Sequence, residues 1–291
     1  MLKKHHVKKG AKLSLNLFAI SLVAVSLIGS YIGLRGHRKP VTRVPSQSYQ
    51  NVSFLSQAQD QMSLEGWFLP ASSTNVAIIA HGWGGNRETF LDLAQYLQRN
   101  GINVLTFDMR GGTGQNSYGQ REAGDIAGAV RWLIDNKQFT SRNIVLIGNS
   151  MGGAASIDYA VNHPQIRGLI LISSVIDLKH TKRYYAQSLG LIFPAVYAAG
   201  VSLSERIFYG VSPTNPIKIF DRLAMPVLVL HGVNDVKSPI ADVYSLQKKA
   251  MQKVRFEIVS DGSHTFFADK DRQQSYVYSQ KIVDFIRSIK D

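Results

Sequence analysis

The strongest chemical signature in the chain is the sequence GNSMG, residues 148–152, with Ser150 at its centre. It has the pattern G-x-S-x-G, which occurs at no other position. An apolar run, Ile144–Ile147, precedes it, and a segment with helical apolar spacing follows. A serine on a sharp turn between a buried strand and a helix exposes its hydroxyl, as in a nucleophile elbow. This context favours an activated serine over a glycine-rich turn with a capping serine.

A serine hydroxyl needs a neighbouring base to become a good nucleophile. His264 and Asp235 each lie just after a predicted strand, later in the chain than Ser150. Since parallel strands end at one edge of a sheet, all three side chains are expected to meet there. His264 would take the serine proton, and Asp235 would orient the imidazole. Asp177 also follows a predicted strand and is an alternative acid.

The reaction also requires N–H donors for the oxyanion of the tetrahedral intermediate. One donor is expected to be the backbone N–H of Met151, directly after the serine. The other is expected in the glycine-rich loop after the apolar run Val76–Ala80, at the backbone N–H of Trp83. The residues that contact the rest of the substrate are not predicted.

Composition excludes several kinds of site. The chain has no cysteine, so it has no disulfide, cysteine nucleophile or thiolate metal site. No metal-ligating cluster is visible, and the predicted chemistry needs no cofactor. The net charge is +13, but nine basic residues lie among the first 43, and no acidic residue precedes Asp60. Because the rest of the chain is nearly balanced, nucleic acid is not an expected partner.

Residues 13–34 contain no charged side chain and are flanked by basic clusters. As a helix they would extend about 33 Å, enough to cross a bilayer core. We predict a basic tail (1–12), a single-pass transmembrane anchor (13–34) and a linker (35–48). A signal peptide cleaved near Ala24–Ser26 is the alternative. Because the N-terminus resembles an export signal, the catalytic domain is expected to be extracytoplasmic.

Residues 49–291 alternate between predicted strands and helices, which predicts an α/β domain with a mostly parallel central sheet and helices on both faces. Residues 177–221 interrupt the alternation and are rich in large apolar side chains, so a helical lid insertion is expected there. The predicted strands are Gln50–Leu55, Ser63–Leu69, Val76–Ala80, Asn103–Phe107, Ile144–Ile147, Leu169–Ile172, Val227–Leu230 and Phe256–Val259, and the predicted helices are Asn86–Arg99, Glu122–Asn136, Met151–Asn162 and Gln274–Ile289.

From about Tyr49 to its end, the chain resembles the α/β-hydrolase superfamily. The similarity is carried by five motifs in the family's order: HGWGGN (81–86), FDMRGG (107–112), GNSMGG (148–153), HGVND (231–235) and DGSH (261–264). They are similar to the oxyanion loop, the D-x-R-G segment, the elbow, the acid loop and the histidine loop. The chain departs from the family pattern D-x-R-G-x-G-x-S, because its second glycine is displaced.

The resemblance is greatest to small serine esterases, monoacylglycerol-lipase-like hydrolases and the catalytic domains of serine peptidases. It implies a carboxylesterase or lipase-like enzyme that cleaves small-molecule or lipid-like acyl esters through an acyl-enzyme. A serine at the elbow argues against epoxide hydrolases and dehalogenases, which use aspartate there. A serine peptidase, a thioesterase and a non-catalytic membrane-tethered binding module stay open, as do the acyl length, the leaving group and the oligomeric state.

Overall fold

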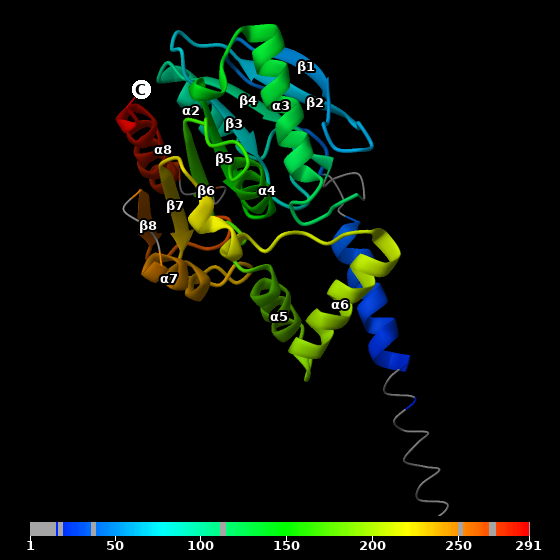
Figure 1. Cartoon of the computed structure of the whole chain (residues 1–291). Helices are drawn as coiled ribbons and strands as arrows, with labels where there is room; N and C mark the ends of the chain where they lie inside the picture. Colours follow the sequence, from blue (N-terminus) through cyan, green and yellow to red (C-terminus); the bar gives the residue numbers. More distant parts are fainter. Residues whose placement is uncertain are drawn as a thin grey trace, which may run out of the picture.

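An eight-stranded sheet in the order β1-β2-β4-β3-β5-β6-β7-β8 runs through the molecule (Figure 1). The structure is a computed structural model that describes residue 16 and residues 20–35, 39–110, 115–249, 253–267 and 272–290. The pairs β1–β2 and β2–β4 are antiparallel, and the other neighbours are parallel, as expected. The strands are β1 (Gln50–Leu55), β2 (Ser63–Leu69), β3 (Val76–Ala80), β4 (Asn103–Phe107), β5 (Ile144–Asn149), β6 (Gly168–Ile172), β7 (Val227–Gly232) and β8 (Val254–Val259).

Helices cover both faces of this sheet, as predicted. Every residue of β3 is buried, and its side chains alternate between two cores: Ile78 packs in one and Ile79 in the other. A strand buried on both faces is mostly apolar, which explains the short apolar runs in the sequence. The first core is covered by α3 (Glu122–Lys137), α4 (Met151–Ala160) and α7 (Ile240–Lys249), and the second by α2 (Leu91–Arg99) and α8 (Arg272–Ser288).

The helix predicted from Asn86 begins later, at Leu91. The segment before it is held as a turn by side chains: the Glu88 N–H donates to Asn86 Oδ1 at 2.9 Å, and the Asn86 N–H donates to Thr89 Oγ1 at 2.9 Å. Asparagine and threonine side chains compete in this way with helical hydrogen bonds. The predicted start was therefore wrong, because Asn86 caps a turn and not the helix.

The insertion at 177–221 is helical, as predicted. It contains α5 (Leu178–Ser188), α6 (Pro194–Tyr209) and the short helices η3 (Pro216–Lys218) and η4 (Phe220–Arg222). Helix α6 has a proline in its first turn, and its C-cap Gly210 has φ of 63°. Proline is common at the start of helices and glycine with positive φ at their end. Figure 1 shows α5 and α6 extending away from the sheet.

Residues 20–34 form a further helix, here called the N-terminal helix, which runs beside α6 (Figure 1). Within the described residues, we find no helix that combines the length and the apolar character needed to cross a membrane. The predicted anchor at 13–34 thus receives no support. Part of it, residues 13–15 and 17–19, lies outside the described residues, as does the basic tail, so the anchor stays a prediction.

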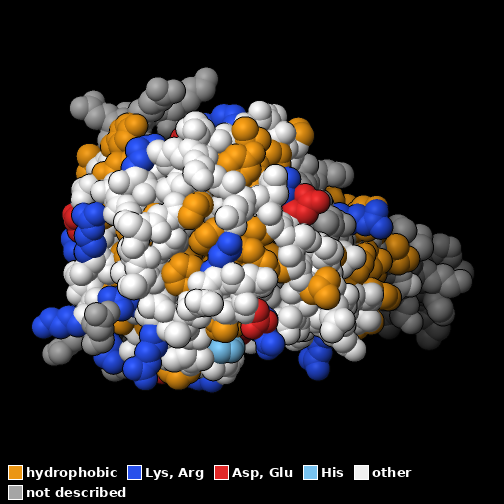
Figure 2. Space-filling view, turned by 90° about the horizontal axis from the view of Figure 1, so that it is seen from above, with side chains coloured by type: hydrophobic (Ala, Val, Ile, Leu, Met, Phe, Trp, Pro, Cys, Tyr) orange, Lys and Arg blue, Asp and Glu red, His pale blue; other side chains and the backbone are white. Residues whose placement is uncertain are grey.

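Positive charge on one face of the molecule is dispersed. Seen from above the view of Figure 1, Lys and Arg side chains lie scattered over this face, with small groups of hydrophobic side chains between them (Figure 2). The Lys and Arg side chains that are coloured in this view do not gather into one patch.

Candidate active site

Ser150 lies at the junction of β5 and α4 in a backbone conformation that few non-glycine residues adopt, with φ of 51° and ψ of −116°. The glycines two positions before and after it have no room for side chains. A Cβ on Gly152 would lie 2.2 Å from the Ala80 carbonyl oxygen, and one on Gly148 would lie 2.6 Å from the Gly153 Cα. The glycines of this motif therefore let β3, β5 and α4 meet closely while the turn presents the serine.

The structure brings Ser150, His264 and Asp235 together. His264 Nε2 lies 3.1 Å from Ser150 Oγ, and His264 Nδ1 lies 2.9 and 2.8 Å from the two carboxylate oxygens of Asp235. Because a carboxylate can only accept, Nδ1 carries the hydrogen, and in a neutral imidazole Nε2 can then accept the serine proton. The Asp235 side chain is fully buried, and that of His264 is 11% exposed.

The loop after β7 keeps Asp235 ionised. Burial raises the pKa of its carboxyl, but hydrogen bonds from His264 and from the backbone N–H groups of Ser238 and Lys237 outweigh burial, so the pKa lies below its usual value. His231 Nε2 faces the Ser238 carbonyl oxygen at 2.9 Å, and burial lowers its pKa. A neutral His231 therefore stabilises the loop that carries Asp235 through this hydrogen bond.

Asp177, the alternative acid, has another role in the structure. Its carboxylate accepts hydrogen bonds from the backbone N–H groups of Lys179 and His180 and from Asn215 Nδ2, at 3.0, 3.2 and 3.0 Å. It is the N-cap of α5. This geometry favours Asp235 as the partner of the histidine.

The two predicted oxyanion donors belong to the residue after the serine and to a loop that approaches the serine closely. Met151 is the first residue of α4, and the loop with Trp83 approaches the elbow so closely that a Cβ on Gly82 would lie 3.0 Å from Ser150 Cβ. Neither the Met151 nor the Trp83 backbone N–H donates to an acceptor among the residues that the structure describes. Both are thus available to a substrate oxygen, and the N-terminus of α4 adds its partial positive charge.

Ser150 opens into a cavity of about 480 Å³. It lies between the carboxyl edge of the sheet, the insertion and the N-terminal helix, and most of its lining is apolar. The sequence did not identify these substrate-facing residues, because they come from segments far apart in the chain. The lining consists of Gly29, Ile32, Gly33, Trp83, Tyr118, Ser150, Met151, Ala154, Val175, Leu178, Thr181, Lys182, Tyr185, Leu189, Tyr197, Val201, Lys237 and Ser238.

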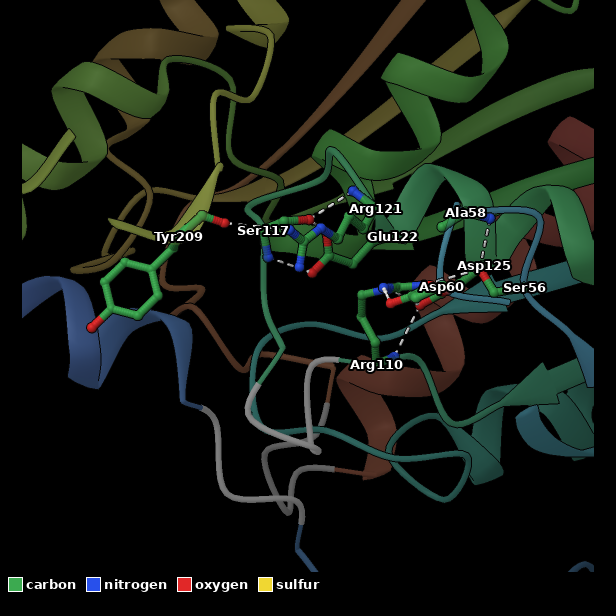
Figure 3. A network of polar contacts seen from close by, with 9 residues as sticks. All are labelled: Ser56, Ala58, Asp60, Arg110, Ser117, Arg121, Glu122, Asp125 and Tyr209. Carbon is green, nitrogen blue, oxygen red and sulfur yellow. Dashed lines mark hydrogen bonds and ion pairs between the residues drawn. The ribbon is translucent and has the colours of Figure 1, made fainter. Parts of the chain in front are cut away.

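A polar network around Arg110 fixes the loop after β4 (Figure 3). Arg110 is fully buried and donates to Asp125 and Asp60 at 2.7 and 2.6 Å, and to Ser56 Oγ at 3.0 Å. Burial alone would lower the pKa of the guanidinium, but the two carboxylates raise it above its usual value. Sequence reasoning noted the D-x-R-G segment but did not foresee that its arginine joins α3 to the β1–β2 connection.

Replacing this arginine should be costly. Arg110→Met is expected to lower the free energy of unfolding by about 3–5 kcal/mol, because it leaves the buried Asp125 carboxylate without a counter-ion. The matched control is Arg131→Met, which breaks the exposed pair with Asp135 and should change the free energy of unfolding far less. Urea denaturation of both variants measures the difference, and equally small losses would contradict the structural role given to Arg110.

Comparison with known proteins places the chain among hydrolases. One family model, described as serine aminopeptidase, S33, matches residues 71–209, and another, the dienelactone hydrolase family, matches residues 194–284. The uncharacterized protein YfhR of Escherichia coli K12 is 29% identical over 252 residues, covering 83% of this chain and 81% of YfhR. The uncharacterized protein MT2364 of Mycobacterium tuberculosis is 31% identical over 213 residues, covering 72% and 70%.

Solved structures share the fold. The esterase PF2001 of Pyrococcus furiosus superposes with a TM-score of 0.72 at 23% identity, over 90% of this chain and 100% of the esterase. The α/β hydrolase GrgF of Penicillium superposes with a TM-score of 0.63 at 18% identity, over 83% and 99%.

Proposed function

The chain belongs to the α/β-hydrolase superfamily, and we propose that it is a serine hydrolase that cleaves carboxylic esters through an acyl-enzyme, as carboxylesterases and lipases do. Ser150 is the nucleophile, His264 the general base, and Asp235 the carboxylate that orients His264. The observation that carries this proposal is the hydrogen-bonded series from Asp235 through His264 to Ser150, at the opening of a largely apolar cavity.

In the first half-reaction, Ser150 Oγ attacks the ester carbonyl carbon while its proton moves to His264 Nε2. The imidazolium that forms is stabilised by the ionised carboxylate of Asp235. The carbonyl oxygen becomes an oxyanion, which accepts hydrogen bonds from the backbone N–H groups of Met151 and Trp83. When the tetrahedral intermediate collapses, the bond to the alkoxy oxygen breaks and His264 returns the proton to the leaving alcohol.

In the second half-reaction, water replaces the alcohol. His264 Nε2 accepts a proton from the water as its oxygen attacks the acyl carbon, and the same two N–H groups hold the second oxyanion. Collapse breaks the bond to Ser150 Oγ, and the imidazolium returns the proton to the serine. The products are a carboxylic acid and the free enzyme.

A substrate panel tests the ester proposal against its alternatives. The serine machinery can also cleave amides and thioesters, and one family model that matches the chain is described as a serine aminopeptidase. Purified full chain should hydrolyse p-nitrophenyl esters with a higher kcat/KM than aminoacyl p-nitroanilides or acyl thioesters. A preference for amides would favour a peptidase, and one for thioesters a thioesterase. Ligand binding without turnover of any class would favour the binding module.

We further propose that the N-terminal segment attaches the protein to a membrane. Support comes from the uncharged stretch 13–34 and from exposed large apolar side chains on the N-terminal helix, among them Ile20, Val23 and Ile28, which are 58–65% exposed. After cell lysis, the full chain should sediment with membranes and resist extraction at alkaline pH. Recovery in the supernatant without detergent would contradict the attachment.

A further inference from the structure

The N-terminal helix packs against the insertion along one face. Ser26, Ser30 and Leu34, spaced four residues apart, are at most 4% exposed. The Ser30 hydroxyl lies 3.2 Å from the carbonyl oxygen of Val201 in α6. Figure 1 shows this helix crossing α6 at an angle. Residues at i, i+4 and i+8 share a helix face, so this face is a contact surface with the hydrolase domain.

Glycines make this contact very close. A Cβ on Gly29 would lie 2.2 Å from Tyr197 Oη, and one on Gly33 would lie 2.0 Å from Tyr118 Oη. On the other side, a Cβ on Gly200 of α6 would lie 2.2 Å from Ser26 Oγ. Small residues let two helices approach to this distance. The two surfaces are thus complementary in shape, residue by residue.

The C-terminal end of the N-terminal helix is hydrogen-bonded to two loops of the hydrolase domain. Trp83 Nε1, from the loop with the expected oxyanion donor, donates to the Gly33 carbonyl oxygen at 3.0 Å, and the Asn116 backbone N–H donates to that of Leu34 at 3.0 Å. The last carbonyls of a helix have no partner within it. Here the hydrolase domain supplies donors to two of them.

The same helix faces the active-site cavity. Gly29, Ile32 and Gly33 line it together with Ser150. The ammonium of Lys182, also in the lining, is paired with Glu205. The space beside the nucleophile therefore presents largely apolar surface, which suits an aliphatic chain better than a charged or strongly polar group.

From these contacts we propose that the N-terminal helix is a wall of the substrate pocket and sets how long an aliphatic acyl chain the enzyme accepts. The inference rests on the proposed function in taking the cavity as the acyl site. Residues 20–34 then help to set substrate specificity and are also a candidate membrane attachment. Ile32 is the largest side chain that this helix contributes to the lining, so it is the one expected to limit the acyl chain.

An engineered disulfide tests the docking of the helix. A Cβ on Gly200 would lie 3.1 Å from Ser26 Cβ, so a small shift brings the pair to the usual disulfide spacing of about 3.5–4.5 Å. In this cysteine-free chain, Ser26→Cys with Gly200→Cys should cross-link on mild oxidation. The control, Ala24→Cys with Gly200→Cys, places the first thiol on the opposite side of the helix and should not. Equal cross-linking of both pairs, or of neither, would overturn the docking.

Acyl-chain selectivity tests whether the N-terminal helix bounds the substrate pocket. Ile32→Trp should lower kcat/KM for p-nitrophenyl decanoate about tenfold relative to the acetate, because the indole fills space that the chain needs. Ile28→Trp, one turn earlier and outside the lining, is the control and should leave this ratio within about twofold. Identical ratios in the two variants would overturn the proposal.

The same pair of variants separates this inference from the proposed function. If the wild-type chain cleaves no ester, the proposed function fails. The role of Ile32 in bounding the pocket is then measured by the binding affinity for 11-(dansylamino)undecanoic acid. Ile32→Trp should then weaken the binding of this fatty acid about tenfold, and Ile28→Trp should not. Equal affinities in the two variants would overturn the inference, whatever the enzyme's activity.

Discussion

The Ser150→Ala variant is expected to lose ester hydrolysis by about five orders of magnitude while it keeps its fold. Without Oγ there is no atom to carry the acyl group, and His264 Nε2 loses the hydroxyl that lies 3.1 Å away. The oxyanion donors stay in place, so a residual rate above that of water should persist. Initial rates on p-nitrophenyl esters and thermal unfolding of the same samples measure activity and fold together.

The matched control is Ser156→Ala, a buried serine two turns along α4. Its hydroxyl donates to the Gly152 carbonyl oxygen at 2.7 Å within the helix and does not face the cavity. We expect its kcat/KM to stay within about twofold of the wild type, since the lost hydrogen bond contributes only about 1 kcal/mol to stability. If Ser150→Ala retained activity comparable to that of the control, Ser150 would not be the nucleophile.

The second large effect separates the two candidate acids. Asp235→Asn should lower the ester hydrolysis rate about ten-thousand-fold, because the new amide can donate to His264 Nδ1 and favours the tautomer whose Nε2 is protonated. That imidazole cannot accept the serine proton. Asp177→Asn, by contrast, keeps a good N-cap for α5 and should leave the rate within about twofold.

Steady-state rates of both variants with the same ester decide between the two assignments. Circular dichroism checks that each variant is folded. We expect Asp235→Asn to fold, because the buried Asp235 accepts two backbone hydrogen bonds that an asparagine oxygen can keep. A large loss in Asp177→Asn together with a small loss in Asp235→Asn would reverse the assignment made from the geometry.

The central strands of this fold could be predicted from the sequence because they are buried on both faces. In β3 and β6, five consecutive buried residues produce a short apolar run that an amphipathic helix would not. Helix boundaries were less certain. The start of α2 was misplaced because Asn86 has the chemistry of a helix cap but here closes a turn, and α7 was not predicted.

The proximity of Ser150, His264 and Asp235 could be predicted because each follows a strand of one parallel sheet. The choice between Asp235 and Asp177 could not be predicted, since both follow predicted strands, and only the three-dimensional arrangement places one of them 2.8 Å from His264. The buried ion pairs of Arg110 were missed for a related reason: their partners, Asp60 and Asp125, are distant in the chain.

The sequence of the N-terminal helix is compatible with two roles. Its apolar composition led to the prediction of a membrane anchor. A second signal lay within it: Ser26, Gly29, Ser30 and Gly33 recur at the spacing of one helix face, which indicates close packing against another helix. The partner, α6, is about 170 residues away, so the contact could not be inferred from local sequence.

An activated Ser150 should react with a fluorophosphonate probe, and mass spectrometry of peptides from the labelled full chain locates the modified residue. We expect one modified residue, Ser150, and loss of the label in His264→Ala, because the serine then has no base. A folded sample that takes no label, or takes it on another residue, would show that Ser150 is not the activated serine.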